Sequence, residues 1–285
     1  MLTTESSLEL KSGQDLWLVV FNDIHWGNTN TLINEFKEAV NRYKKKNSVF
    51  LGNGDLFDSI IIKDIRFQLS QLSGMKEGNS LVDDFMDAYV SAFVETWKSF
   101  EIPPERVIGF GMGNHEYEIM KRYATNPVKR VCEKCNLRYL GYSGFHTLHL
   151  TNSDYGRSNN VRIFYHHGYG GGSRTGGYPI TKYEKEMVHH EADIYVFGHD
   201  HGKRYLVSYP YLSPAKRGNK VYCKNRILGI SGTFMVTKPI TEYPGYAEVK
   251  GFPPSDLGYL PIKIKVRSTK VNGKNRRWVE LKVFD

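Results

Sequence analysis

Cysteine is scarce in this sequence. Only three of the 285 residues are cysteines, an odd number that is too small for a disulfide framework. Cys132 and Cys135 form a CEKC segment that resembles half of a zinc knuckle, but no second CxxC pair completes a set of four ligands. We therefore expect no metal-binding or redox role for these two cysteines.

Long apolar runs are also absent. No segment approaches the roughly 18 uncharged apolar residues of a membrane-spanning helix, and Met1–Asp15 lacks the basic start and apolar stretch of a signal peptide. A cytoplasmic protein without a membrane partner is therefore expected. Hydrophobic residues make up 40% of the chain and aromatic residues 13%, which favours one large domain with a full core over a disordered chain.

Acidic residues are few near the C-terminus. The chain has a formal net charge of +9, and residues 262–285 hold eight Lys or Arg against two acids, so +6 lies there and +3 in the other 261 residues. The pattern IKIKVR…VNGK…WVELKV predicts a β-hairpin that turns at Asn272-Gly273.

The predicted hairpin has two different faces. In this register the apolar face pairs Ile262 with Val283, Ile264 with Leu281, and Val266 with Val279. The other face sets Lys263, Lys265 and Arg267 opposite Lys282, Glu280 and Trp278. Two interpretations stay open: a solvated edge whose lysines discourage aggregation, or a surface that attracts polyanions.

Five segments share one pattern, an apolar strand that runs into Gly, Asp, Asn or His. They are DLWLVVFNDIH, SVFLGNGDLFD, RVIGFGMGNHE, VRIFYHHG and ADIYVFGHDH. An apolar stripe within residues 31–47 predicts a helix between the first two, which makes a βαβ unit. A second helix is expected from a cap at Ser80 to just before Pro103-Pro104, and a third around Ile180 to Glu191.

These elements predict a single α/β domain over residues 1–285, with two sheets that face each other. No internal repeat and no domain boundary is evident. The glycine-rich segment HHGYGGGSRTGGYP lies within the second half and is expected to be an active-site loop rather than a linker. Residues 239–285 are expected to form a C-terminal appendage that contains the basic hairpin.

Polar side chains gather where the five strands end. In an α/β sheet the carboxyl ends of the strands share one rim, so these side chains should converge in one crevice. Carboxylates and imidazoles without thiolates suit Mn, Fe, Co, Ni or Zn better than Ca. The residues are Asp23 and His25, Asp55 and Asp58, Asn114 and His115, His166 and His167, and His199 and His201.

The order D-x-H, G-D-x-x-D, G-N-H-E, H-G, G-H-x-H resembles the calcineurin-like metallophosphoesterase superfamily. The resemblance extends from Asp23 to His201 and implies a four-layer α/β/β/α sandwich of two facing mixed sheets. It also implies a dinuclear metal centre, and it favours His167 over His166 because the family's ligand directly precedes glycine. The implied ligands are Asp23, His25 and His201 on one ion, Asn114, His167 and His199 on the other, and Asp55 as the bridge.

Such a centre supplies its own nucleophile. A water molecule that bridges two divalent cations has a pKa near neutrality and is readily converted to hydroxide. No serine or cysteine nucleophile is therefore needed. Mn²⁺ is the expected metal, with Fe, Ni, Co or Zn as alternatives. His115 resembles the family's histidine that protonates the leaving oxygen, although it could instead only orient Asn114. Asp58 could support His115 or cap the following helix.

The substrate is less well defined by the sequence. Ser/Thr protein phosphatases of this superfamily carry GDxVDRG and an arginine after GNHE, whereas this chain has GDLFDSI and GNHEYEI, closer to the nuclease and phosphodiesterase branches. Arg174 and Lys182 are candidates to hold a phosphate. The expected function is phosphodiester hydrolysis, with nucleic acid or nucleotides as one substrate class. The alternatives are a phosphomonoesterase or small-molecule or lipid phosphodiesterase, and a non-catalytic scaffold.

Overall fold

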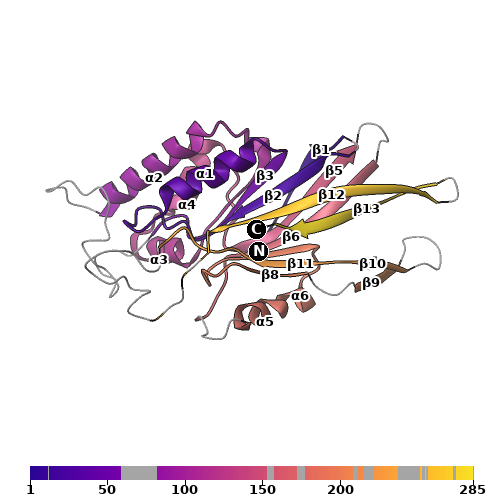
Figure 1. Ribbon diagram of the computed structural model, residues 1–285. Coiled ribbons are helices and arrows are strands. Elements are labelled where there is room, and N and C mark those ends of the chain that lie inside the picture. Colours follow the sequence, from indigo (N-terminus) through magenta and orange to yellow (C-terminus); the bar gives the residue numbers. More distant parts are fainter. Residues whose placement is uncertain are drawn as a thin grey trace.

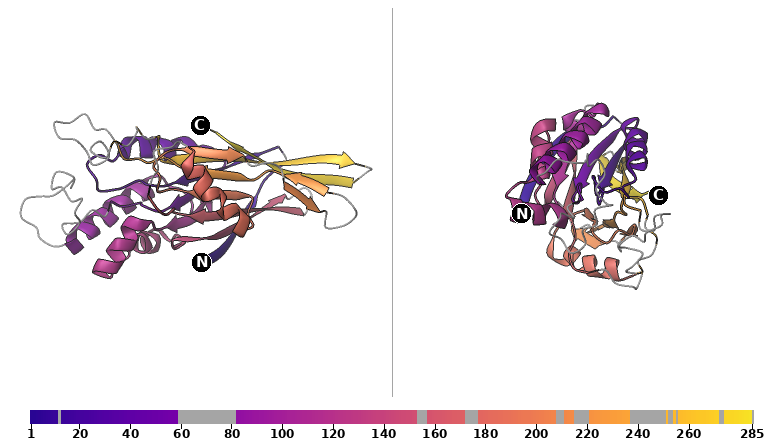
Figure 2. Two further views of the ribbon diagram at one scale, coloured as in Figure 1. Left: turned by 90° about the horizontal axis from the view of Figure 1, so that it is seen from below. Right: turned by 90° about the vertical axis from the view of Figure 1, so that its left-hand side faces the viewer.

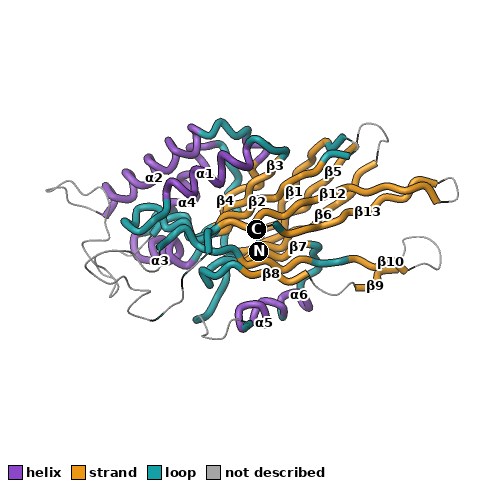
Figure 3. The backbone as a smooth tube through the Cα atoms, viewed as in Figure 1, coloured by secondary structure: helices purple, strands orange, loops and turns teal. Residues whose placement is uncertain are grey.

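Two β-sheets pack face to face, and helices lie on the outer side of each (Figure 1). The computed structural model describes residues 1–11, 13–58, 82–152, 157–171, 177–207, 211–214, 221–236, 251, 254, 256–271 and 274–284. The expected four-layer α/β/β/α architecture is confirmed. Figure 3 colours the helices purple and the strands that they cover orange.

The first sheet has five strands in the order β13-β12-β2-β3-β4. Strands β2, β3 and β4 run parallel, as the predicted βαβ unit requires, and β12 is antiparallel to β2. The strands are β2 (Asp15–Phe21), β3 (Ser48–Asn53), β4 (Val107–Gly111), β12 (Tyr259–Val271) and β13 (Lys274–Val283).

The C-terminal hairpin has the predicted register. Ile262 faces Val283 and Lys265 faces Glu280, while the turn residues 272 and 273 lie outside the described part of the chain. Because β12 lies between β13 and β2, the hairpin is part of the five-stranded sheet, not an addition to it. The expected boundary at residue 239 falls on residues that the structure does not describe.

The second sheet has six strands in the order β1-β5-β6-β7-β11-β8, and β9 and β10 form a separate two-stranded ribbon. Strands β6, β7 and β11 are parallel. The strands are β1 (Leu2–Glu9), β5 (Ser143–Asn152), β6 (Arg157–His166), β7 (Ile194–Phe197), β8 (Arg204–Val207), β9 (Tyr211–Pro214), β10 (Val221–Lys224) and β11 (Ile227–Ile230).

Helices bury apolar stripes on both outer faces. In α1 the predicted stripe is buried through Phe36, Ala39, Val40 and Tyr43. The predicted third helix is divided into two short helices, α5 and α6, and the Ser80 cap lies outside the described residues. The helices are α1 (Ile33–Lys44), α2 (Val82–Ser99), α3 (Asn114–Tyr123), α4 (Pro127–Cys135), α5 (Tyr178–Glu184) and α6 (Glu186–His189).

The core has three layers that match this architecture. Apolar residues such as Leu18 and Ile163 fill the space between the sheets. A second cluster packs α1, α2 and α4 on the five-stranded sheet, and a third packs α5 and α6 on the six-stranded sheet. Cys132 belongs to the second of these clusters, where burial raises the pKa of its thiol to about 12. Among the described helices, none is long and apolar enough to span a bilayer.

Candidate metal centre

Two buried asparagines join the sheets at one end. Asn22 directly follows β2, and Asn53 is the last residue of β3. Asn22 donates to the carbonyl oxygen of Phe197 at 3.2 Å and to the hydroxyl of Ser231 at 2.6 Å. Asn53 donates to the carbonyl oxygens of His166, at 3.0 Å, and of Val196, at 3.3 Å. These bonds bring the polar ends of β2 and β3 against those of β6 and β7. Sequence reasoning missed both asparagines.

One group of side chains combines two of the predicted segments. Oδ1 of Asp23 lies 3.3 Å from Nε2 of His201 and 3.9 Å from Nε2 of His25, and the two imidazole nitrogens are 3.2 Å apart. Oδ1 of Asp23 is buried and has no hydrogen-bond partner within the described part of the chain. The carboxylate oxygen of Asp23 and the two imidazole nitrogens are therefore close enough together to hold a divalent cation.

A second group lies on the other side of Asp55. Nε2 of His167 is 3.2 Å from Oδ2 of Asp55 and 3.0 Å from Oδ1 of Asn114, which is 2.7 Å from Nδ1 of His199. The other ring nitrogens are held by carbonyl oxygens, Nδ1 of His167 by Asn53 at 3.1 Å and Nε2 of His199 by Gly170 at 2.7 Å. Such bonds orient imidazole ligands toward a metal.

Asp55 lies between the two groups. Its carboxylate shares one cluster with His167 and His199, and another with His25 and His115. The structure therefore brings together all seven predicted ligands, with the carboxylate of Asp55 next to members of both groups. His166 is held elsewhere, because its Nδ1 accepts the N–H of Gly168 at 2.9 Å.

The ligands depend on an uncommon backbone conformation. Five of the seven have positive φ angles, between 48° and 71°. Non-glycine residues rarely adopt this left-handed region, and where they do, they cluster at functional sites. The tight turns let successive polar side chains leave the strand ends toward one point. The five residues are Asp23, His25, Asp55, His199 and His201.

Glycines allow the loops to approach the ligands closely. A Cβ atom on Gly113 would lie 2.1 Å from Oδ1 of Asp55, and one on Gly54 would lie 2.5 Å from Nδ1 of His167. Gly54 also has a φ of +103°, which side-chain-bearing residues rarely adopt. Space therefore requires a glycine at position 113, and both space and backbone geometry require one at position 54.

The charges of the centre favour a cation. Burial raises the pKa of Asp55, but His167 and His115 outweigh it and hold that pKa well below its ordinary value. Burial lowers the pKa of His167, yet Asp55 and other carboxylates raise it to about 9. Burial and the adjacent His115 lower the pKa of His25 to about 4, which keeps its imidazole in the neutral form that binds metals.

His115 is oriented by Asp58. Nδ1 of His115 lies 3.0 Å from Oδ1 of Asp58, and Nε2 lies 4.0 Å from Oδ2 of Asp55. Asn28 donates to the other oxygen of Asp58. Burial raises the pKa of Asp58, but His115 and His25 lower it to about 2. Of the two interpretations of Asp58, the contacts favour support of His115.

Glu116 is a buried residue that sequence reasoning missed. Its carboxylate accepts the N–H groups of Asp55 at 3.2 Å, Phe57 at 2.8 Å and Gly113 at 2.8 Å. Burial and the neighbouring Asp55 raise the pKa of Glu116 to about 7. Glu116 thus holds the loop after β3 against the start of α3. Its place in the GNHE motif was the available signal.

The expectation that Lys182 is free for a phosphate is wrong. Its Nζ is buried and lies 2.8 Å and 3.0 Å from the carboxylate oxygens of Asp200, and it also donates to the carbonyl oxygen of Tyr169. Asp200 stands between two predicted ligands, so this ion pair fixes their loop. The other candidate, Arg174, lies outside the described residues.

Comparisons with known proteins identify the family. A family model described as calcineurin-like phosphoesterase matches residues 16–203, more than half of the chain, which therefore belongs to this family. The family implies a phosphoesterase hydrolase that binds divalent metals.

Solved structures show only distant similarity. Vacuolar protein sorting 29 from Cryptosporidium parvum is 11% identical, with a TM-score of 0.38 over 95% of this chain and 100% of that chain. A protein from Streptococcus pneumoniae described as a predicted phosphoesterase is 12% identical, with a TM-score of 0.32 over 94% and 100%. Vps29 from Entamoeba histolytica in complex with zinc is 12% identical, with a TM-score of 0.34 over 94% and 99%. The comparison with curated protein sequences gives no significant match.

Proposed function

We propose that this chain binds two divalent cations and hydrolyses phosphodiesters. The observation that carries the proposal is the pair of ligand groups on either side of the buried carboxylate of Asp55. One group would hold the first cation through Asp23, His25 and His201, and the other would hold the second through Asn114, His167 and His199. Mn²⁺ is the first candidate, and Fe, Co, Ni and Zn have compatible ligand chemistry.

When bound, such cations polarise phosphoryl oxygens and make water a nucleophile near neutral pH. The chain's own residues provide the orientation and the proton. Because Asp58 holds Nδ1 of His115, Nε2 remains directed toward the site, 4.0 Å from Asp55. An N–H at Nε2 is in place to protonate the oxygen that leaves phosphorus.

The preference for a diester rests on charge. Among the described residues, no arginine or lysine forms a hydrogen bond or ion pair with the seven proposed ligands, and Lys182 is neutralised by Asp200. A monoester dianion is commonly clamped by arginines, whereas a diester carries a single negative charge. Nucleic acid or nucleotides are the substrate class that we propose.

Elemental analysis combined with two substrates tests this function. The wild-type protein, loaded with Mn²⁺ and desalted, should carry two metal ions per chain and hydrolyse bis-p-nitrophenyl phosphate faster than p-nitrophenyl phosphate. Asp55→Asn should lose metal at both positions and turnover with it. Asp87→Asn, which changes an exposed aspartate in α2, should match the wild type. An active Asp55→Asn protein with two metal ions would contradict the proposal.

A further inference from the structure

One face of the five-stranded sheet extends beyond the helices that cover it. Strand β12 pairs with β2 only from Tyr259 to Lys265, whereas β12 and β13 continue together to Val271 and Lys274. Figures 1 and 2 show this hairpin projecting away from α1, α2 and α4. Arg267 and Trp278, which lie beyond the end of the β12–β2 pairing, are exposed to solvent.

This face carries cations and aromatic rings, which we name the basic face. Its members share one side of the sheet because residues directly opposite each other on paired strands point to the same side. The residues on the other side, such as Ile264 and Leu281, face the six-stranded sheet and belong to the core. The basic face comprises Lys263, Lys265, Arg267 and Lys282 with Trp17 and Trp278.

Two carboxylates order the cations without neutralising them all. Asp15 lies 2.5 Å from Nζ of Lys263 and 3.2 Å from Nζ of Lys265. Glu280 lies 2.7 Å from Nε of Arg267 and 3.1 Å from Nζ of Lys282. Each carboxylate therefore holds two cations in place, and the face keeps a net positive charge.

Exposure on the basic face increases outward along β12, and from β12 to the edge strand β13. The Lys263 side chain is 19% exposed, whereas those of Arg267 and Lys282 are 47% and 58% exposed. Trp278 is 49% exposed and lies opposite Arg267. An indole ring that stays half in water beside a cation is a platform on which a nucleobase can stack.

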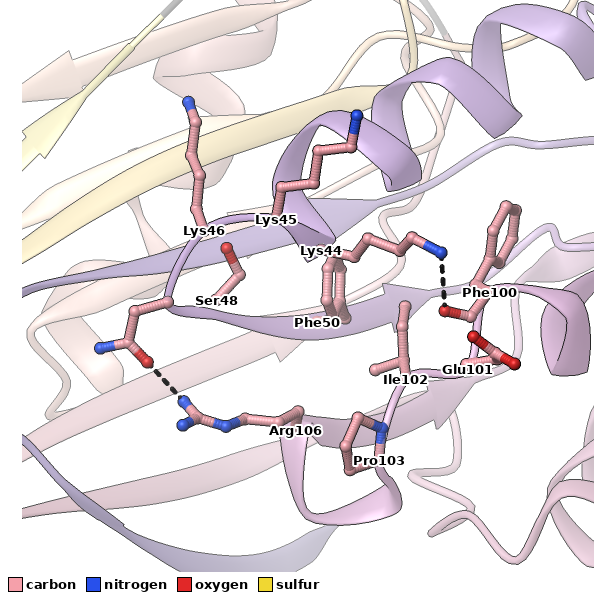
Figure 4. Close-up of a pocket in the computed structure, with 11 residues that line it drawn as sticks. Lys44, Lys45, Lys46, Ser48, Phe50, Phe100, Glu101, Ile102, Pro103 and Arg106 are labelled. Atoms are coloured by element: carbon pink, nitrogen blue, oxygen red, sulfur yellow. Dashed lines mark hydrogen bonds between the residues drawn. The ribbon is translucent and has the colours of Figure 1, made fainter.

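The positive surface continues onto the end of α1. Nζ of Lys46 lies 4.5 Å from the centre of the Trp17 ring, so Lys46 adjoins the basic face. Lys45 and Lys46 are both exposed. Together with Arg106 they border a cavity of about 410 Å³, and Figure 4 shows their side chains extending away from it. Nζ of Lys263 lies 5.3 Å from the centre of the Trp17 ring, so this ring joins Lys46 to the basic face.

We propose that the basic face binds single-stranded nucleic acid, with cations on the phosphates and a base stacked on Trp278. Cations two residues apart on a strand lie roughly 7 Å apart, a regular row that suits a polymer of phosphates. A lipid surface is a poorer match, because the aliphatic side chains of the hairpin face the core.

The basic face lies far from the metal centre. Asp15 is the first residue of β2, and Asp23 lies two residues after the end of this strand. The two are roughly 25 Å apart along an extended chain. The basic face therefore holds the polymer without taking part in the chemistry. The inference goes beyond the proposed hydrolysis and holds whether or not the metal centre is active.

Fluorescence anisotropy of the full chain with labelled oligodeoxythymidylate, in EDTA to prevent cleavage, tests the proposal. Trp278→Ala should weaken binding about tenfold without changing the salt dependence, and Trp278→Phe should restore most of the loss. Changing Lys265, Arg267 and Lys282 together to Gln should reduce the slope of log K against log salt by about 2, since each phosphate contact on a single strand contributes about 0.7.

Matched controls separate this result from general charge effects and from the metal centre. Changing Lys98, Lys129 and Lys134 to Gln removes the same charge from exposed positions of α2 and α4 and should leave binding unchanged. Asp55→Asn should bind the oligonucleotide as the wild type does. The proposal is overturned if the basic-face variants bind like the wild type, or if phosphatidylserine vesicles bind to this face and the oligonucleotide does not.

Discussion

At the scale of single residues, His115 is the side chain whose role depends most on its orientation. Asp58 occupies its Nδ1, and its Nε2 faces the proposed ligands. We expect His115→Asn to retain metal but to lower kcat by about 10²–10⁴-fold, most strongly for diesters with poor leaving groups, because these need the proton most. Steady-state kinetics over a series of leaving groups measures this dependence. Equal losses for good and poor leaving groups would instead make His115 a residue that only orients Asn114.

The buried ion pair of Lys182 and Asp200 supports the neighbouring ligands. Both side chains are almost fully buried, at 7% and 2% exposure. Lys182→Met should destabilise the protein by about 3–5 kcal/mol, because it leaves the Asp200 carboxylate buried without a cation. Urea denaturation measures the loss.

The matched control removes both charges. Lys182→Met combined with Asp200→Asn should recover part of the stability, since an uncompensated buried charge is then no longer present. A single variant as stable as the wild type would show that the pair contributes nothing to the loop.

At the scale of elements, the turn between β4 and α3 is the most tightly packed part of the centre. Gly113→Ala places a methyl group where Oδ1 of Asp55 now lies, 2.1 Å from the new Cβ. We therefore expect weaker metal binding and a lower melting temperature, measured by metal titration and calorimetry. Gly171→Ala is the control, because its Cβ would meet no atom of the described residues within 4 Å and should be tolerated. Normal metal affinity in Gly113→Ala would show that this close approach is not required.

Elements with local signals could be predicted from the sequence. The hairpin register followed from Asn272-Gly273 and strict alternation, and the convergence of the ligands followed from polar residues at parallel strand ends. Strand β1 could not be found in this way, because its mostly polar sequence pairs with β5, about 140 residues away. Elements whose stability comes from distant partners give little sign of it locally.

The same limit applies within the site. Asn22, Asn53 and Glu116 hold the centre through bonds to segments far along the chain, so their roles became evident only in three dimensions. The sequence does not show that Lys182 is paired for the same reason, because its partner Asp200 is 18 residues away. The ligands could be proposed because they stand at the ends of apolar strands in the order of a known family. Asn22 and Asn53 stand at the same strand ends, and only their distant partners reveal what they do.

At the scale of the whole molecule, stability should depend on pH through buried histidines. Burial and the nearby Arg138 lower the pKa of His146 to about 4, and its ring nitrogens lie 2.9 Å from the hydroxyls of Thr4 and Ser6. Because the folded pKa is below the unfolded value of about 6.5, this stability is present above pH 6.5 and is lost as the pH falls toward 4.

His146 is expected to contribute a loss of about 2 kcal/mol of unfolding free energy between about pH 7 and about pH 5. Urea denaturation in the presence of a chelator measures it without a contribution from metal. His146→Gln should show a pH dependence that is smaller by this amount. An unchanged dependence in the variant would mean that His146 is not the group that titrates.

The central claim is that seven side chains from two sheets hold two neighbouring cations. Anomalous diffraction from crystals of the wild-type protein soaked in Mn²⁺ tests it most directly. We expect two adjacent peaks, one at Asp23, His25 and His201, and the other at Asn114, His167 and His199, with the carboxylate of Asp55 touching both. A single peak at saturating Mn²⁺, or a pair of peaks that Asp55 does not join, would contradict it.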